Sequence, residues 1–189
     1  MSDFEQRFQE YLDQQEEQHK EEFRIQRNAF QSGYEFPMRV SYRNDDPSFF
    51  WGIKDLGRTD RLCSEYCYYA SCEGMTVPQL EAYFQAGNKI RHALAEPTER
   101  GHTYTLIDLV LCTDAIPSDL RKKLRRHSDV IQYKDEAGTG WSEVRICVVD
   151  LNSGEIITNK DGGPLKNRLT GNLEEKRTSF FEKMFGRKK

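Results

Sequence analysis

The sequence predicts an α+β domain in which helices pack on a mixed β-sheet, with the element order α-β-β-β-α-β-α-β-β. Helical patterns separate strand patterns within residues 62–112 and again within 104–151, and right-handed crossovers of this kind join parallel neighbours. Two strand patterns joined by a short turn at 44–47 indicate that the sheet also has antiparallel neighbours. The 189 residues are enough for one such domain with a sizeable core.

The chain should begin with a long polar helix over residues 3–31. Apolar side chains recur at helical spacing near its start, and apolar character returns near its end: Phe4, Phe8, Tyr11, Leu12, Phe23 and Phe30. Residues 14–22 between them are almost wholly polar, so we expect this helix to cover an edge of the core. Ser32 and Gly33 are typical of the end of a helix.

Three strands are expected next, at 34–44, 48–54 and 62–72. The first alternates, which predicts five apolar side chains on one face: Tyr34, Phe36, Met38, Val40 and Tyr42. Pro37 favours an edge position for this strand or a place among its first residues, because proline cannot donate a hydrogen bond to a neighbouring strand.

The third of these strands carries three of the five cysteines, in the stretch CSEYCYYASC at 63–72. On a strand that rises ~3.3 Å per residue, Cys63 and Cys67 share a face but stand about 13 Å apart. Tetrahedral zinc needs sulfur atoms within ~4 Å of each other, and the gaps do not match the paired C-x-x-C spacing. We therefore expect structural thiols, with no metal site and no cofactor.

The second half of the chain alternates between helices and strands. A helix is expected from Thr76 to Pro97, because Thr76 and Gln79 form a capping-box pattern. A short basic helix should follow at 118–128. A β-hairpin around a glycine-containing turn is expected at 141–160.

Residues 101–114 should form the central strand, because they are apolar on both faces apart from Asp108. A lone acid in such a strand needs a cation, and Arg145 in a neighbouring strand can supply it. We expect these two side chains to lie within salt-bridge distance.

Three segments are expected: an N-terminal polar helix at 1–32, a single α+β domain at 33–170 and a basic amphipathic tail at 171–189. As a helix, the tail brings four apolar side chains onto one face: Phe180, Phe181, Met184 and Phe185. Such a face docks on the protein's own domain or engages a protein partner. The glutamates of the tail make a membrane surface the weaker alternative.

Charge and cysteine usage narrow the function classes. Lysine and arginine total 28 against 31 acidic residues, and a formal net charge of −3 predicts no general affinity for nucleic acid or anionic membrane. No apolar run approaches the ~18–20 residues that span a bilayer. An odd number of cysteines and an N-terminus without a signal-peptide pattern favour a cytoplasmic protein.

The chain contains the stretches TYTLIDLVLCTDAIPSDLRKKLRRH and GWSEVRICVVDLNSGEIITNKDG. These stretches resemble an uncharacterised bacterial domain family, whose members pair an lvxVt strand with a GWxxVRlxxVDLxxxxvxxNxxG hairpin. The resemblance covers roughly residues 30–170, includes SEYCYY, and is strongest from Gly140 to Gly162. It implies one intact domain and brings no known activity.

Four polar residues are the candidates for catalysis: Asp108, Glu143, Arg145 and Asp150. The predicted element order is also that of restriction-endonuclease-like nucleases, which hold Mg²⁺ with strand carboxylates beside a lysine. Here Glu143-Val144-Arg145 stands where acid-x-Lys is expected, and arginine cannot lose a proton. Glu65 is likewise not followed by x-Lys. An ion pair between Asp108 and Arg145 is therefore the favoured interpretation.

The basic helix carries the candidates for binding phosphate groups of nucleic acid: Arg121, Lys122, Lys123, Arg125 and Arg126. The helix macrodipole also favours cations near a helix C-terminus, and neither a stacking platform nor a glycine-rich phosphate loop accompanies them. Nucleic-acid binding is therefore disfavoured. The four histidines, His19, His92, His102 and His127, lack the spacing of metal ligands.

These patterns favour a non-enzymatic cytoplasmic binding or interaction module. The alternative is a degenerate restriction-endonuclease-like fold that is inactive or binds nucleic acid. The surroundings of Asp108 discriminate between them. Clustered acids in an open cleft favour a metal enzyme, whereas an ion pair under a helix favours a scaffold.

Overall fold

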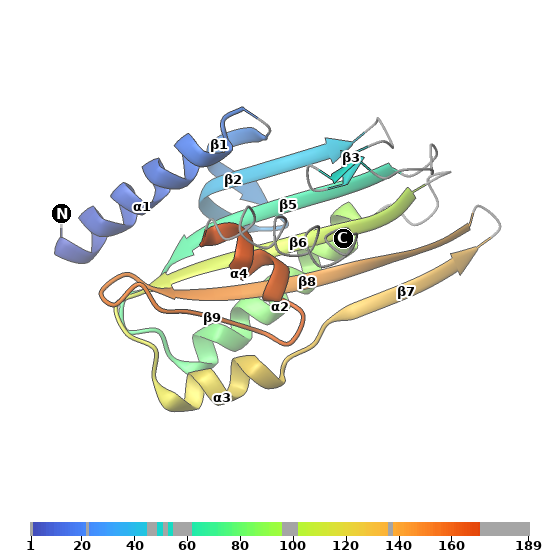
Figure 1. Cartoon of the computed structure of the whole chain (residues 1–189). Coiled ribbons are helices and arrows are strands. Elements are labelled where there is room, and N and C mark those ends of the chain that lie inside the picture. Colours follow the sequence, from blue (N-terminus) through green and yellow to red (C-terminus); the bar gives the residue numbers. More distant parts are fainter. Residues whose placement is uncertain are drawn as a thin grey trace, which may run out of the picture.

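The structure is a computed structural model that describes residues 2–21, 23–44, 49–50, 53–54, 62–95, 102–135 and 138–170. Within these residues the protein folds into a mixed seven-stranded sheet with helices packed on it (Figure 1), which confirms the predicted α+β class. The helices are α1 (Asp3–His19), α2 (Val77–Leu94), α3 (Ser118–Arg126) and α4 (Gly163–Leu169). The strands are β1 (Arg24–Gln31), β2 (Tyr34–Asn44), β3 (Phe49–Phe50), β4 (Ile53–Lys54), β5 (Leu62–Ser71), β6 (His102–Thr113), β7 (Val130–Asp135), β8 (Gly138–Asp150) and β9 (Ile156–Thr158).

The large sheet has the strand order β1-β2-β5-β6-β8-β7, and β9 pairs with the last part of β8. Strands β5, β6 and β8 are parallel neighbours, with α2 between the first two and α3 between the last two. Strands β1, β2, β7 and β9 are antiparallel to their neighbours. The predicted parallel crossovers, the central position of β6 and the C-terminal hairpin of β8 and β9 are therefore confirmed.

Helices α2 and α3 cover one face of the sheet. Their apolar side chains, including Leu80, Phe84, Leu120 and Leu124, pack against Ile107, Leu109, Leu111, Val144 and Ile146. Gly87 allows α2 to approach the sheet closely, because a Cβ atom there would stand 2.6 Å from Cγ1 of Val144. At the start of α2 the Thr76 amide donates to Oε1 of Gln79 over 2.9 Å, as the capping-box pattern predicted.

Helices α1 and α4 cover the opposite face. Phe8, Leu12, Leu165 and Leu169 pack there against Met38, Val40, Tyr69, Val110, Val149 and three cysteines, Cys67, Cys112 and Cys147. All five cysteines are free thiols, and burial raises the pKa of Cys67 to about 12. In this layer the thiols therefore serve as small buried side chains.

The predicted helix over residues 3–31 is wrong beyond His19. Residues 24–31 form β1, which pairs antiparallel with β2 through a two-residue turn. Both turn residues, Ser32 and Gly33, have positive φ, at 52° and 88°, and this left-handed geometry matches a tight β-hairpin. The residues that suggested a helix end are therefore the turn of a hairpin.

The prediction that residues 34–42 keep one apolar face is also wrong. Phe36 packs under α2 and α3, whereas Met38 and Val40 pack under α1 and α4. The change of face occurs at Pro37, which lies across from Asn28, a residue with φ of 50°. Pairing of β2 with β5 begins only at Met38, so Pro37 stands in the first part of β2, where the described residues form no ladder with β5 and the missing N–H costs no hydrogen bond to that strand.

Other expectations in the same regions need correction. Strands β3 and β4, inside the predicted strand at 48–54, pair with each other in a separate two-stranded sheet, so β2 is not their partner. Strand β7 was not predicted. The predicted element order placed no helix between the hairpin at 141–160 and the tail, but this segment contains α4. The predicted apolar face of the tail, at 171–189, lies outside the described residues.

Candidate functional site

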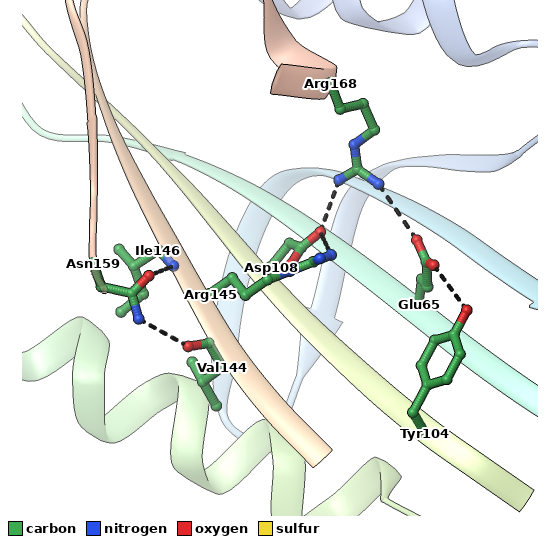
Figure 2. A network of polar contacts seen from close by, with 8 residues as sticks. All are labelled: Glu65, Tyr104, Asp108, Val144, Arg145, Ile146, Asn159 and Arg168. Carbon is green, nitrogen blue, oxygen red and sulfur yellow. Dashed lines mark hydrogen bonds and ion pairs between the residues drawn. The ribbon is translucent and has the colours of Figure 1, made fainter. Parts of the chain in front are cut away.

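Asp108 and Arg145 form a buried, two-pronged ion pair across the centre of the sheet (Figure 2). They occupy paired positions on the parallel strands β6 and β8. Nε of Arg145 donates to Oδ1 of Asp108 over 2.6 Å, and its Nη2 donates to Oδ2 over 2.8 Å. The two side chains are only 0% and 3% exposed, for Asp108 and Arg145 respectively. The ion pair predicted from the sequence is therefore confirmed.

Helix α4 adds a second guanidinium above this pair. Nη2 of Arg168 donates to Oδ2 of Asp108 over 2.8 Å, and Nη1 lies 3.5 Å from Oε2 of Glu65 on β5. We call Glu65, Asp108, Arg145 and Arg168 the ion-pair cluster. It joins three adjacent strands to a helix that follows them in the chain.

The environment of Glu65 shifts its titration strongly. Burial raises the pKa of Glu65 to about 7, and the charge of Arg168 opposes part of that rise. The hydroxyl of Tyr104 donates to Oε1 of Glu65 over 3.4 Å, and the Tyr104 ring packs on Trp141 with 4.8 Å between ring centroids. At neutral pH this carboxyl group is therefore only partly ionised.

This geometry does not match a metal-dependent nuclease centre. Both carboxylate oxygens of Asp108 accept from arginines. Asp150 lies five residues along β8 from Arg145, about 16 Å away on an extended strand. There its carboxylate accepts from the amides of Asn152 and Ser153 in the turn before β9. Among the described residues, no three His, Cys, Asp or Glu side chains lie close enough to hold a metal ion.

Glu143 stands beside the ion-pair cluster without contacting Asp108 directly. It shares a face of β8 with Arg145 and is half-buried, and burial raises its pKa. The structure therefore brings Asp108 and Arg145 together, leaves Glu143 next to them and separates Asp150. The four catalytic candidates do not form one site.

The residues of the C-terminal hairpin motif have structural roles. Oδ1 of Asn159 accepts from the Ile146 amide over 3.0 Å, and its Nδ2 donates to the carbonyl of Val144 over 3.1 Å (Figure 2). Strand β8 pairs with β7 up to Glu143 and with β9 from Cys147. Between these two ladders the Asn159 side chain makes the hydrogen bonds that a neighbouring strand would make. Gly162 must be glycine, because a Cβ atom would stand 2.7 Å from Oδ1 of Asn159.

A pocket of about 630 Å³ lies beside β9, between α3 and α4. Three cations line this basic pocket: Arg125, Lys160 and Lys166. Lys166 also donates from Nζ to the carbonyl of Ile156 over 2.8 Å, which ties α4 to β9. Within the described residues, Arg125 and Lys160 have no ion-pair partner.

Glu155 lies at the rim of the basic pocket and shows how a carboxylate is held there. Arg121 binds it with both terminal nitrogens, Nη2 at 2.8 Å from Oε2. The hydrogen bond from Arg121 lowers the pKa of Glu155, and the charges of Arg121, Lys166 and Arg125 lower it further. The positive charge at this place therefore favours an anionic group.

The other cations of α3 divide into two kinds. Lys123 pairs with Glu81 of α2, whereas Lys122 and Arg126 are exposed to solvent. His127, directly after α3, stacks on Phe84 with ring centroids 3.7 Å apart, and burial lowers its pKa. The basic helix is therefore partly neutralised by its own domain, and only its C-terminal end contributes to the basic pocket.

Sequence reasoning missed Arg168, Lys160 and Lys166. Arg168 lies on a seven-residue helix, which is too short to give a clear periodic pattern. Lys160 directly follows Asn159 of the hairpin motif. Its place next to that motif was the one sequence feature that could have pointed to the pocket. Glu65 was considered only for a nuclease motif, which it does not complete.

The comparisons with known proteins identify a family and no activity. Residues 7–170 match a family described as a domain of unknown function, DUF8052. No curated protein and no solved structure matches the chain. The expectation that the chain belongs to an uncharacterised domain family is confirmed, since the match covers most of the chain. The chain belongs to the DUF8052 family.

Proposed function

We propose that this chain is a non-enzymatic binding module whose basic pocket holds an anionic group of a partner molecule. The observation that carries the proposal is that Arg125, Lys160 and Lys166 line one pocket, where none of the three has an ion-pair partner within the described residues and Lys166 donates to a backbone carbonyl. A cation without a partner is available to an incoming phosphate or carboxylate.

The composition of the basic pocket supports binding over catalysis. Its described lining contains no His, Cys or Asp side chain. Asn159 is engaged by the backbone of β8, and Glu155 is held by Arg121. The remaining polar groups, Thr158 and Thr170, add hydrogen-bonding hydroxyls beside the cations.

A single anionic group suits this pocket better than a nucleic-acid backbone. Arg121 and Lys123 are already paired with Glu155 and Glu81, which shortens the basic surface of α3. A chain with a formal net charge of −3 also lacks the broad positive field that attracts a polyanion. The alternative of a degenerate nuclease that binds nucleic acid therefore becomes an outcome of the test below.

The tail is the second candidate contact for a partner, as the alternative to docking on its own domain. It begins one residue after Thr170, which lines the basic pocket. A protein partner that contacts the apolar face of Phe180, Phe181, Met184 and Phe185 would be tethered beside that pocket. Free thiols at all five cysteines support a reducing compartment such as the cytoplasm. None of the described helices is long and apolar enough to cross a membrane.

The test is an NMR titration of the full chain with inorganic phosphate at constant ionic strength. We expect the amide signals of residues 154–160 to shift. Lys160→Glu should weaken binding by about tenfold or more, since one charge-assisted hydrogen bond contributes ~1.5–3 kcal/mol and each 1.4 kcal/mol is about tenfold in affinity. Lys122→Glu is the matched control, because it makes the same charge change on α3 outside the pocket lining.

Two outcomes would overturn the proposal. Equal weakening by both variants would show only a general effect of charge. Tighter binding of a single-stranded oligonucleotide, with a steep dependence on salt, would favour the nucleic-acid alternative instead.

A further inference from the structure

Strand β7 forms one edge of the large sheet. It pairs with β8 on its inner side, and no described element lies along its outer side (Figure 1). It also exposes two aliphatic side chains, with Val130 at 44% and Ile131 at 40%. Such an edge can extend its sheet by pairing with another strand.

The pairing of β7 with β8 determines which backbone groups face outward. The amide of Val144 donates to the carbonyl of Asp129 over 2.9 Å, so this pair is of the hydrogen-bonded kind. Because the two kinds of pair alternate in an antiparallel ladder, Ile131 and Tyr133 also bond to β8. The N–H and C=O groups of Val130, Gln132 and Lys134 therefore face away from the sheet.

The opposite edge of the sheet is protected. Strand β1 carries Arg24 and Arg27, and Arg27 bonds to Asp13 and Glu16 of α1. Asn28 has φ of 50°, which breaks the regular extended backbone of β1. Charges and irregularities of this kind discourage edge-to-edge pairing. No described residue of β7 has positive φ.

We propose that β7 pairs antiparallel with β7 of a second copy of this chain, about a twofold axis at Gln132. In this register Gln132 faces Gln132 of the second copy, and Val130 faces its Lys134. The outward groups of the two strands then make about six backbone hydrogen bonds. Two seven-stranded sheets become one continuous sheet.

The side chains of β7 suit this register. Ile131 lies opposite Tyr133 of the second copy, and by symmetry Tyr133 lies opposite its Ile131. Aromatic and β-branched residues are favourable cross-strand pairs. Lys134 faces the aliphatic Val130. The one pair of like charges, Asp135 opposite Asp129 of the second copy, lies at the end of the pairing, where Asp129 is already bound to Arg91 of its own chain. The strand is therefore complementary to itself, which favours a second copy over an unrelated strand.

The oligomeric state of the full chain tests the proposal. We expect sedimentation equilibrium at micromolar concentration to give twice the chain mass of 22.2 kDa. Gln132→Pro should give the single-chain mass, because proline removes an outward N–H and leaves the bonds to β8 in place. Phe30→Lys is the control. Phe30 is 65% exposed on the other edge, and its replacement should leave the dimer unchanged.

A cysteine pair tests the register without relying on proline. In the proposed dimer the two copies of residue 132 are directly opposite, with Cα atoms ~5.5 Å apart, which suits a disulfide. The two copies of residue 130 stand about 13 Å apart. Oxidation should therefore link Gln132→Cys into dimers and leave Val130→Cys unlinked.

Three results would overturn the proposal. The first is the single-chain mass for the unaltered protein at every concentration. The second is a dimer that persists in Gln132→Pro. The third is equal disulfide linking at positions 130 and 132, which would indicate random collision.

Discussion

At the scale of single residues, Asp108 depends on two guanidinium groups. Its carboxylate is fully buried and accepts from Arg145 and Arg168. Replacing it with alanine would leave two buried cations with only Glu65 as an acidic partner in the ion-pair cluster. We expect Asp108→Ala to lower the free energy of unfolding by ~3–5 kcal/mol, measured by urea denaturation.

The control for this prediction is Glu35→Ala. Glu35 is an exposed acid of β2, and surface changes of this kind alter stability by less than ~0.5 kcal/mol. A loss under ~1 kcal/mol for Asp108→Ala would contradict the role given to the ion-pair cluster.

Glu65 should make stability depend on pH. Its pKa in the folded protein, about 7, exceeds the ordinary value of 4.5, so the folded state holds the proton more tightly than the unfolded state. The stabilisation of the folded state that comes from binding this proton is fully present below pH 4.5 and is lost as pH rises through 7. At ~1.4 kcal/mol for each tenfold change in acid strength, the loss is roughly 3 kcal/mol. Arg168, Arg145, Asp108 and Tyr104 are the groups that face this carboxyl.

The matched variant is Glu65→Gln, which keeps the shape and cannot ionise. We expect its stability relative to the unaltered chain to rise between pH 5 and pH 8 in urea melts. Using the difference between the two proteins removes the contributions of His19 and His127. Parallel pH profiles would show that Glu65 does not titrate in this range.

At the scale of elements, Gly87 sets how closely α2 lies on the sheet. A Cβ atom there would clash with Val144 and press on Leu109, so the helix or the strand must shift. We expect Gly87→Ala to destabilise the protein by ~1–3 kcal/mol in thermal and urea melts, although alanine is the better helix former.

Gly163→Ala provides the comparison. A Cβ atom at Gly163, in the first turn of α4, would meet nothing within 4 Å. The melting temperature of the Gly163→Ala protein should stay the same or rise slightly. Similar losses at both glycines would mean that close packing of α2 is not the cause.

At the scale of the whole molecule, the tail should contribute to stability. Its four apolar side chains form one face in a helical pattern, and exposed faces of this size are costly in water. We expect deletion of residues 173–189 to lower the melting temperature and to increase binding of a fluorescent apolar dye, because the tail would no longer cover its own domain.

Deletion of residues 187–189 alone is the control, since it removes three cations and keeps the apolar face. An unchanged melting temperature with reduced dye binding, after the longer deletion, would instead mark the tail as an exposed element for a partner.

The sequence by itself determined the elements whose burial is written in local patterns. Strand β6 could be placed at the centre because it is apolar on both faces, and its single acid required a cation from a neighbour. Arg145 was identified for that reason, and the hairpin motif was recognised as part of a family. The binding candidates on α3 were also found, but not which of them are already paired.

Only the tertiary structure decided the rest. Strand β1 is polar and lacks a clear alternation, because it lies at an edge and is held by hydrogen bonds to β2. The ion-pair cluster joins positions 65, 108, 145 and 168, and the basic pocket joins α3 to β9 and α4. The local pattern of apolar and polar residues predicts whether a side chain is buried. The pattern does not identify the oppositely charged residue that pairs with a buried charge, because that partner is distant in the sequence and is brought near only by the packing of the whole chain.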